Sequence, residues 1–282
     1  MLTWEDIERL RDVTFHRTTE LQIRSVAQAE AFINKVGFCF AFQAAQPELP
    51  CLWHAAAGER NPAYPLHVQH DPYIGLVWEA KDRLAATKSV YYGKVLKRRP
   101  SFISLEYFPF FYRLELNRRC GDYYAEYSAG KISREAKMIL DALHERSPQV
   151  TGELKSAAGM TAPEKRHAFG QAMAELQSRF WVVKIGEFDE PFTFLWDLVE
   201  RRFAEEIEQA KQCAPQEACR SILQKFFEIS FAAGFSALER LFGFPSALLE
   251  TSLSELIREG KIVDCVQVAN EKKLLYGKAE LL

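Results

Sequence analysis

Residues 163–196 read PEKRHAFGQAMAELQSRFWVVKIGEFDEPFTFLW, and this stretch decides the fold. Apolar side chains of its first half recur at helical spacing, at Phe169, Ala172, Met173, Leu176 and Phe180. This spacing predicts one buried face of a helix that Pro163 opens. The second half holds two β-like runs, WVVKIGEF and FTFLW, which join around Asp189–Pro191. The stretch therefore predicts a helix followed by a β-hairpin.

Two further helices are expected upstream of this stretch. Apolar side chains at Ala136, Ile139, Leu140 and Leu143 mark a helix over residues 133–146. Thr151 begins a shorter helix, GELKSAA, which Gly159 ends. Three helices followed by a two-stranded hairpin is the order of a winged helix, in which a helix-turn-helix leads into a β wing. We therefore expect a winged-helix domain over residues 131–200.

The same order occurs again over residues 201–282. Its first helix carries an apolar face at Ile222, Leu223, Phe226 and Ile229. A short second helix covers residues 236–241, and Pro245 opens a third that ends at Gly260. The runs IVDCVQV and KKLLYGKAEL then form a hairpin around Ala269–Asn270. We expect this segment to be a C-terminal winged-helix domain.

Residues 1–130 are predicted to form a mainly helical N-terminal region. Helices are expected over residues 3–12, 26–36 and 72–86, with a proline-containing loop over residues 61–72. A divergent winged helix with insertions is the alternative for this region. The chain as a whole is therefore expected to be mostly α with small β-hairpins, of the α+β class, built from tandem winged-helix (helix-turn-helix) domains.

The charge of the chain is balanced overall and uneven locally. The sequence has 36 Lys+Arg against 38 Asp+Glu, which excludes a uniformly basic nucleic-acid binder. Residues 81–99 nevertheless hold seven basic side chains against Asp82 alone, with two tyrosines among them. Cations that meet phosphates and rings that stack on bases suit nucleic acid. A solvated basic helix face is the alternative interpretation.

These patterns predict contacts with the backbone of duplex DNA. The predicted DNA-binding residues are Lys81, Tyr91, Tyr92, Lys94, Lys97, Arg98 and Arg99, together with Lys165 and Arg166 on the third helix of the first complete winged helix. The third helix of the C-terminal copy instead carries Glu250, Glu255 and Glu259. Carboxylates repel phosphates, so this copy is expected to serve as a scaffold or to bind a protein partner.

Other sequence features narrow the classes of function. We expect no signal peptide, because residues 1–12 lack the charged-then-apolar layout, and no membrane span, because no run of about 18 apolar residues occurs. Six cysteines at irregular spacing without CxxC are typical of reduced thiols, so we expect a cytoplasmic protein. His67, His70 and Asp71 have a spacing that could hold zinc, but a third strong ligand is not evident. The common phosphate-loop, dinucleotide and serine-hydrolase motifs are missing. We therefore expect neither a metal nor a cofactor.

Five segments carry a resemblance to a known family. They are INKVGFCFAF (33–42), ELPCLWHAAAG (48–58), WEAKDRL (78–84), YYGKVLKRRP (91–100) and ISLEYFPFFYRL (103–114). Together with the winged-helix order, these segments resemble AlkZ-related proteins, which are relatives of the AlkZ/YcaQ bacterial DNA glycosylases. The resemblance implies a bacterial protein of tandem winged helices with a role in DNA repair. In these glycosylases, excision of alkylated or crosslinked bases needs no metal.

The resemblance implies that phenylalanines stand in this chain where the glycosylases have their catalytic motif. In the glycosylases, a helix that ends in Leu-Gly is followed closely by the motif Gln-x-Gln or Gln-x-Asp. By the resemblance, Val36-Gly37 corresponds to the end of that helix. The two motif positions then fall on Phe40 and Phe42, whose rings neither accept a proton nor orient water. Gln43 and Gln46, just downstream, are weak alternatives for the catalytic amides.

Three functions follow as hypotheses. The first is a DNA-binding protein of DNA repair, or of another DNA transaction, in which phenylalanines replace the catalytic glutamines. The second is an active, metal-independent, monofunctional glycosylase that uses a displaced Gln or a carboxylate to remove alkylated or crosslinked bases. The third is a winged-helix module that binds proteins and no nucleic acid.

Overall fold

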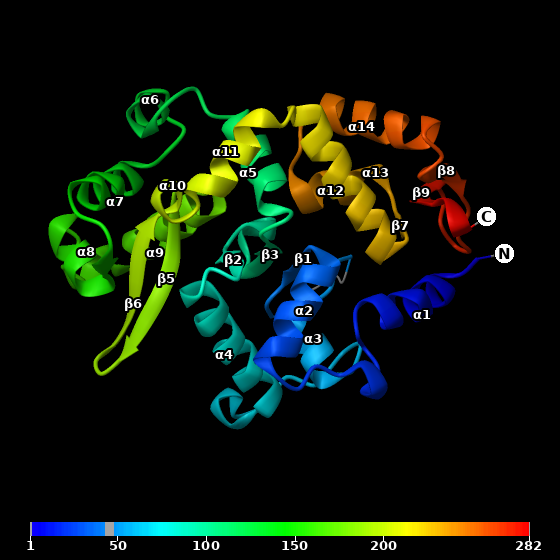
Figure 1. Cartoon of the computed structure of the whole chain (residues 1–282), viewed down its shortest axis with the longest axis horizontal. Helices are drawn as coiled ribbons and strands as arrows, with labels where there is room; N and C mark the ends of the chain where they lie inside the picture. Colours follow the sequence, from blue (N-terminus) through cyan, green and yellow to red (C-terminus); the bar gives the residue numbers. More distant parts are fainter. Residues whose placement is uncertain (1, 43–47, 282) are drawn as a thin grey trace.

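The computed structural model describes residues 2–42 and 48–281. Most of its helices and strands form three sets with the same element order (Figure 1). In each set a helix leads into a short strand, and two more helices precede an antiparallel hairpin. In each sheet the last strand lies between the other two, in the orders β1-β3-β2, β4-β6-β5 and β7-β9-β8. This is the winged-helix topology repeated three times, and it confirms the α+β, tandem winged-helix prediction.

The first set lies in the N-terminal region. It consists of α2 (Val26–Val36), β1 (Phe38–Phe40), α3 (Leu52–Ala57), α4 (Pro72–Ala86), β2 (Val90–Gly93) and β3 (Ser101–Ser104). The helices predicted over residues 26–36 and 72–86 are confirmed residue for residue. Ser25 and Asp71 begin them, because their side chains accept hydrogen bonds from the backbone N–H of Gln28 and Ile74.

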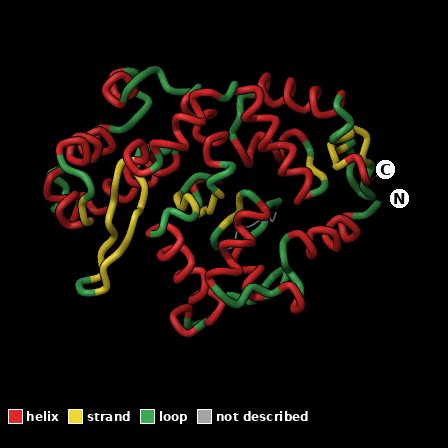
Figure 2. The backbone as a smooth tube through the Cα atoms, viewed as in Figure 1, coloured by secondary structure: helices red, strands yellow, loops and turns green. Residues whose placement is uncertain are grey.

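The second and third sets follow the predicted order. The second consists of α7 (Arg134–Glu145), β4 (Gln149–Val150), α8 (Thr151–Ala157), α9 (Arg166–Ser178), β5 (Val182–Asp189) and β6 (Phe192–Leu198). The third consists of α12 (Pro215–Ser230), β7 (Ala232–Ala233), α13 (Phe235–Phe242), α14 (Ser246–Arg258), β8 (Ile262–Val266) and β9 (Leu275–Lys278). The hairpin of β5 and β6 is long and projects beyond the helices (Figure 2). The domain boundaries at residues 130 and 200 stay a prediction.

The remaining helices connect the three sets. They are α1 (Trp4–Thr14), α5 (Phe108–Leu116), α6 (Tyr123–Ser128), α10 (Val199–Arg202) and α11 (Ala204–Gln212). Within the described residues, none of the helices is both long and apolar enough to cross a bilayer.

The first and third sets share one hydrophobic core, with α5 between them. The ring of Phe38 in β1 meets Phe111 of α5 at 5.2 Å and Phe242 of α13 at 5.9 Å between ring centres. The second set has a separate core around Leu140, Leu176 and other buried side chains. The second set therefore lies at one end of the molecule and the third set at the other, as Figure 1 shows.

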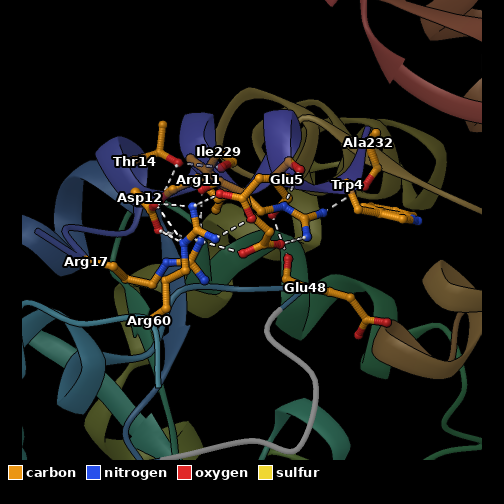
Figure 3. Close-up of polar contacts among 12 residues, drawn as sticks. Trp4, Glu5, Arg11, Asp12, Thr14, Arg17, Glu48, Arg60, Ile229 and Ala232 are labelled. Atoms are coloured by element: carbon orange, nitrogen blue, oxygen red, sulfur yellow. Dashed lines mark hydrogen bonds and ion pairs between the residues drawn. The ribbon is translucent and has the colours of Figure 1, made fainter. Parts of the chain in front are cut away.

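Helix α1 fastens the first set to the third (Figure 3). The Arg11 guanidinium donates hydrogen bonds to the backbone oxygens of Ser230 at 2.8 Å and Ala232 at 2.9 Å. On the other side of α1, Asp12 pairs with Arg60 at 2.6 Å. The segment before α1 also contacts the third set, because Leu2 bridges to Val268 in the connection between β8 and β9.

Candidate nucleic-acid interface

The turn between β2 and β3 concentrates basic side chains on a strained backbone. We call residues 94–99 the basic loop. Lys97 and Arg98 are exposed and adopt φ angles of 51° and 56°, in the left-handed region that residues with a Cβ avoid. Such strain costs of order 1–2 kcal/mol per residue and persists where the surrounding structure enforces it, which is a frequent property of functional segments.

The basic loop forms one wall of a groove of about 550 Å³, which we call the central groove. Six basic side chains line it, namely Lys97, Arg98, Arg118, Lys131, Arg179 and Arg240. The lining includes one carboxylate, Glu115. These side chains come from the basic loop, from the segments around α5 and α6, and from the C-terminal ends of α9 and α13. All three winged helices or their connections therefore contribute positive charge to one hollow.

Ion pairs within the protein neutralise part of this charge. The Arg179 Nε is 2.8 Å from Glu115, and its guanidinium also pairs with Glu126. Lys97 lies 3.4 Å from Glu48, at the edge of the groove. Arg98 and Arg240 have no ion pair among the described residues. These two cations are therefore available to an external anion without loss of an internal partner.

A second hollow, of about 890 Å³, extends the central groove toward the C-terminus. Arg240 lines both hollows. The second hollow also contains Lys272 and Lys273 from the β8–β9 connection, and Arg11 and Glu48 from the N-terminal region. Basic side chains thus run from α9 to the last hairpin, and in the second hollow Glu48, Asp264 and Glu271 lie among them.

Glu126 anchors the wall of the groove where α5, α6 and α9 meet. Its carboxylate is fully buried and accepts hydrogen bonds from Arg179, from the Cys120 backbone N–H at 2.6 Å and from the Cys120 thiol at 3.0 Å. Burial raises the pKa of Glu126, but these hydrogen bonds and the Arg179 charge outweigh burial and lower its pKa to about 2. Glu126 is therefore ionised at neutral pH and holds Arg179 in place.

The structure places several predicted DNA-binding residues away from the central groove. Tyr91 is 0% exposed, and its ring packs against Phe108, Phe180 and Phe203 at 5.0–5.4 Å between ring centres. Burial raises the pKa of Tyr91 well above its usual value. Tyr91 is thus a core residue that cannot reach a base in this fold, which corrects the expectation that its ring stacks on nucleic acid.

Lys81, Lys94 and Tyr92 lie together at a different place. Lys81 belongs to a cluster with Asp82, Lys184 and Glu187, in which both lysines contact the Asp82 carboxylate. Burial lowers the pKa of Lys81. Lys94 and the half-buried Tyr92 line a hollow of about 270 Å³ beside this cluster. Of the seven basic side chains over residues 81–99, Lys97 and Arg98 alone line the central groove.

Lys165 and Arg166 are exposed at the start of α9. Lys165 donates a hydrogen bond to the Gly159 oxygen at 2.8 Å. Arg179, which lines the groove, follows the other end of the same helix, about 20 Å away for a helix of this length. The structure therefore does not bring Lys165 and Arg166 to the central groove. Arg99 is exposed at the end of the basic loop, and its carbonyl accepts a hydrogen bond from Ser101.

Phe40 and Phe42, which the sequence resemblance predicts at the glycosylase motif positions, pack into the core of the first set. Phe40 is 1% exposed and lies in β1, where it pairs with Ser101 of β3. Phe42 is half-buried and packs against the same core. The weak alternatives Gln43 and Gln46 lie outside the described residues. Sequence reasoning provided no signal for Arg118, Lys131 or Arg240 because they are far apart in the chain and converge only in the fold.

Two other sequence patterns have structural roles. Asp71 of the His67–His70–Asp71 pattern begins α4, and the two histidine rings lie 6.2 Å apart between centres. Across residues 2–42 and 48–281, no three potential ligands gather around a common point. In the C-terminal winged helix, Glu255 and Glu259 lie 3.8 Å and 3.1 Å from Arg220, so part of the acidic face is paired internally. The protein partner expected there stays a prediction.

Comparison with known proteins identifies the family. The model of a family described as AlkZ related matches residues 23–243, which is more than half of the chain. Among solved structures, the DNA glycosylase AlkZ of Streptomyces sahachiroi has a similar fold, with a TM-score of 0.58 and 13% sequence identity over 99% of this chain and 71% of that one. No curated protein matches the chain. The family model spans all of the first two winged helices and the start of the third, and the chain therefore belongs to the AlkZ-related family.

Proposed function

We propose that the protein binds duplex DNA along the central groove, in a DNA-repair process, through contacts with the phosphate backbone. The observation that carries this proposal is the convergence of six Lys and Arg side chains from distant segments on one hollow, against a single lining carboxylate. A chain with a net charge of −2 attracts DNA only through such a local concentration. Membership of the AlkZ-related family supports DNA as the ligand.

We further propose that the protein does not cleave a glycosidic bond. Phe40 and Phe42 take the positions that the glycosylase motif assigns to water-positioning groups. The burial of Phe40 in the sheet supports this part, because an apolar ring in a packed core offers neither a hydrogen bond nor a base. Release of a methylated or crosslinked base from duplex DNA by the protein would overturn it and would revive the hypothesis of an active glycosylase.

Charge reversal tests the groove. In fluorescence anisotropy with duplex DNA, the double substitution Lys97→Glu and Arg98→Glu should weaken binding strongly. It should also lower the slope of log affinity against log salt by about two, one for each lost phosphate contact. Arg240→Glu should act in the same direction, because Arg240 links the two hollows.

Arg83→Glu is the matched control for these variants. Arg83 also lies within residues 81–99 but is exposed on α4, where it pairs with Glu79 outside the groove. Its reversal should leave the salt slope nearly unchanged. If Arg83→Glu weakens binding as much as the groove variants do, the site is not the groove. If the wild-type protein binds no DNA at low salt, the winged helices serve protein interaction instead.

A further inference from the structure

A pocket with aromatic walls lies at Phe42, the second of the two phenylalanines at the expected motif positions. Its volume is about 330 Å³, and we call it the aromatic pocket. The side chains that line it are Phe42, Trp53, Tyr64, Val68, Ile74 and Trp78. Four of the six are aromatic and none carries a charge. The volume lies within the range of small-molecule pockets, and uncharged walls disfavour a phosphate or a carboxylate as the occupant.

Three elements of the first winged helix build the pocket. Trp53 comes from α3, Ile74 and Trp78 from α4, and Tyr64 from the proline-containing connection between these helices. The rings of Trp53 and Tyr64 meet edge to face, at 5.8 Å between centres and 80° between planes. Tyr64 is 69% exposed, so one wall is open to solvent.

One of the side chains that line the pocket also has a polar group without a partner. Trp53 is 1% exposed, and its indole Nε1 has no hydrogen-bond partner among the described residues. Buried polar groups are almost always hydrogen-bonded, and an unpaired donor costs of the order of a lost hydrogen bond. The indole N–H can only donate. The aromatic lining of the pocket itself suits a ligand with an aromatic face.

Two backbone hydrogen bonds connect the aromatic pocket to Pro100, the residue that follows the basic loop. The Ala41 N–H donates to the Pro100 oxygen at 2.9 Å, and the Ala41 oxygen accepts from the Trp53 N–H at 3.2 Å. Phe42 follows Ala41, and Pro100 follows the last residue of the basic loop. Two walls of the pocket are thus fixed to the segment that would hold the phosphate backbone.

We propose that the aromatic pocket binds one unstacked nucleobase of the DNA held along the central groove. The proposal rests on the proposed function, since the basic loop would bring the strand to the pocket. Aromatic side chains stack on the face of any base, whatever its identity. A perfect duplex keeps its bases stacked, so the pocket would favour DNA in which one base is already unpaired.

The experiment compares two DNA probes that differ by one nucleotide. One is a perfect duplex and the other carries a single unpaired 2-aminopurine as a bulge, whose fluorescence reports on its surroundings. Wild-type protein should bind the bulged probe about tenfold more tightly, which is the scale of one base–aromatic stack. Tyr64→Ala should lose this preference and the change in 2-aminopurine fluorescence, while it keeps wild-type affinity and salt slope on the perfect duplex.

Two further variants complete the design. Trp78→Phe keeps an aromatic wall and should retain most of the preference. Tyr73→Ala is the matched control, because Tyr73 is an exposed tyrosine on α4 that does not line the pocket, and it should behave as wild type. The proposed base-binding role of the pocket would be overturned if wild-type protein bound both probes equally, or if Tyr64→Ala kept the preference for the bulged probe. Salt-dependent binding of the duplex would still support the proposed function in either case. Failure to bind either probe would overturn both.

Discussion

Arg179 lies between two buried carboxylates, Glu115 and Glu126, at the wall of the central groove. The position of this cation depends on its ion pairs, and the pKa of Glu126 is about 2 in the folded protein. Because the folded pKa lies below the usual value of 4.5, ionised Glu126 stabilises the fold above that value. The contribution disappears as the pH falls toward 2.

The substitution Glu126→Gln should therefore destabilise the protein at neutral pH and much less in acid. At pH 7 the substitution should lower the free energy of unfolding by about 1.5–3 kcal/mol, the range for a hydrogen bond to a charged group. Urea unfolding at pH 7, 5, 4 and 3 measures the difference from wild type, which should shrink progressively below pH 4.5. Glu164→Gln, an exposed carboxylate beside α9, serves as the control. A difference that is constant with pH would contradict the role of the Glu126 charge.

Individual residues also show where sequence reasoning is limited. Lys97 and Arg98, which line the central groove, could be singled out from the basic side chains over residues 81–99, because an exposed turn keeps its charges at the surface. Tyr91 belongs to the same window, yet alternation along β2 turns its ring inward against Phe108. Arg240 stands more than a hundred residues from the basic loop, and only the shared core of the first and third sets brings it into the groove. No local pattern contains that information.

At the scale of elements, helix α1 depends on Arg11 more than on its surface charges. The Arg11 side chain is buried and donates to two backbone oxygens at the junction of α12 and β7. Arg11→Met keeps the apolar stem but leaves both oxygens without this donor, and it should lower the free energy of unfolding by about 1.5–3 kcal/mol. Hydrogen exchange should show α1 opening first.

Arg9→Met provides the comparison on the same helix. The Arg9 side chain is 68% exposed and makes only surface ion pairs with Glu5 and Asp6, which are worth little. Its effect on stability should stay below about 0.5 kcal/mol. If both variants destabilise the protein equally, the attachment of α1 does not depend on the Arg11 hydrogen bonds.

Helices whose apolar side chains recur with a clear helical period were predicted from the sequence, and strands of two residues were not. Helices α2 and α4 have caps and apolar faces that define their ends. The strands β4 and β7 contain two residues each, which is too short for a period of two to be recognised. The first winged helix was left open as a divergent copy because long connections separate β1, α3 and α4 and hide the repeated order. Pairing across the sheet, which is a non-local property, reveals it.

At the scale of the whole molecule, the central groove requires the second winged helix to stay fixed against the rest. Arg119 makes much of this connection. Its guanidinium donates to the backbone oxygens of Arg179 at 2.6 Å and Phe180 at 3.2 Å, and it lies 3.6 Å above the centre of the Trp181 ring. These contacts join the segment after α5 to the end of α9, which is where Arg179 enters the groove.

Arg119→Ala should therefore weaken DNA binding, although Arg119 does not line the groove. Loss of two hydrogen bonds to carbonyls and of a cation–π contact should lower the free energy of unfolding by about 2–4 kcal/mol. The freed segment should make residues 117–133 more sensitive to limited proteolysis. DNA affinity should fall while the salt slope stays near the wild-type value, because no phosphate contact is removed. A reduced slope would instead place Arg119 itself on the DNA, and unchanged affinity would mean that the groove tolerates movement between its walls.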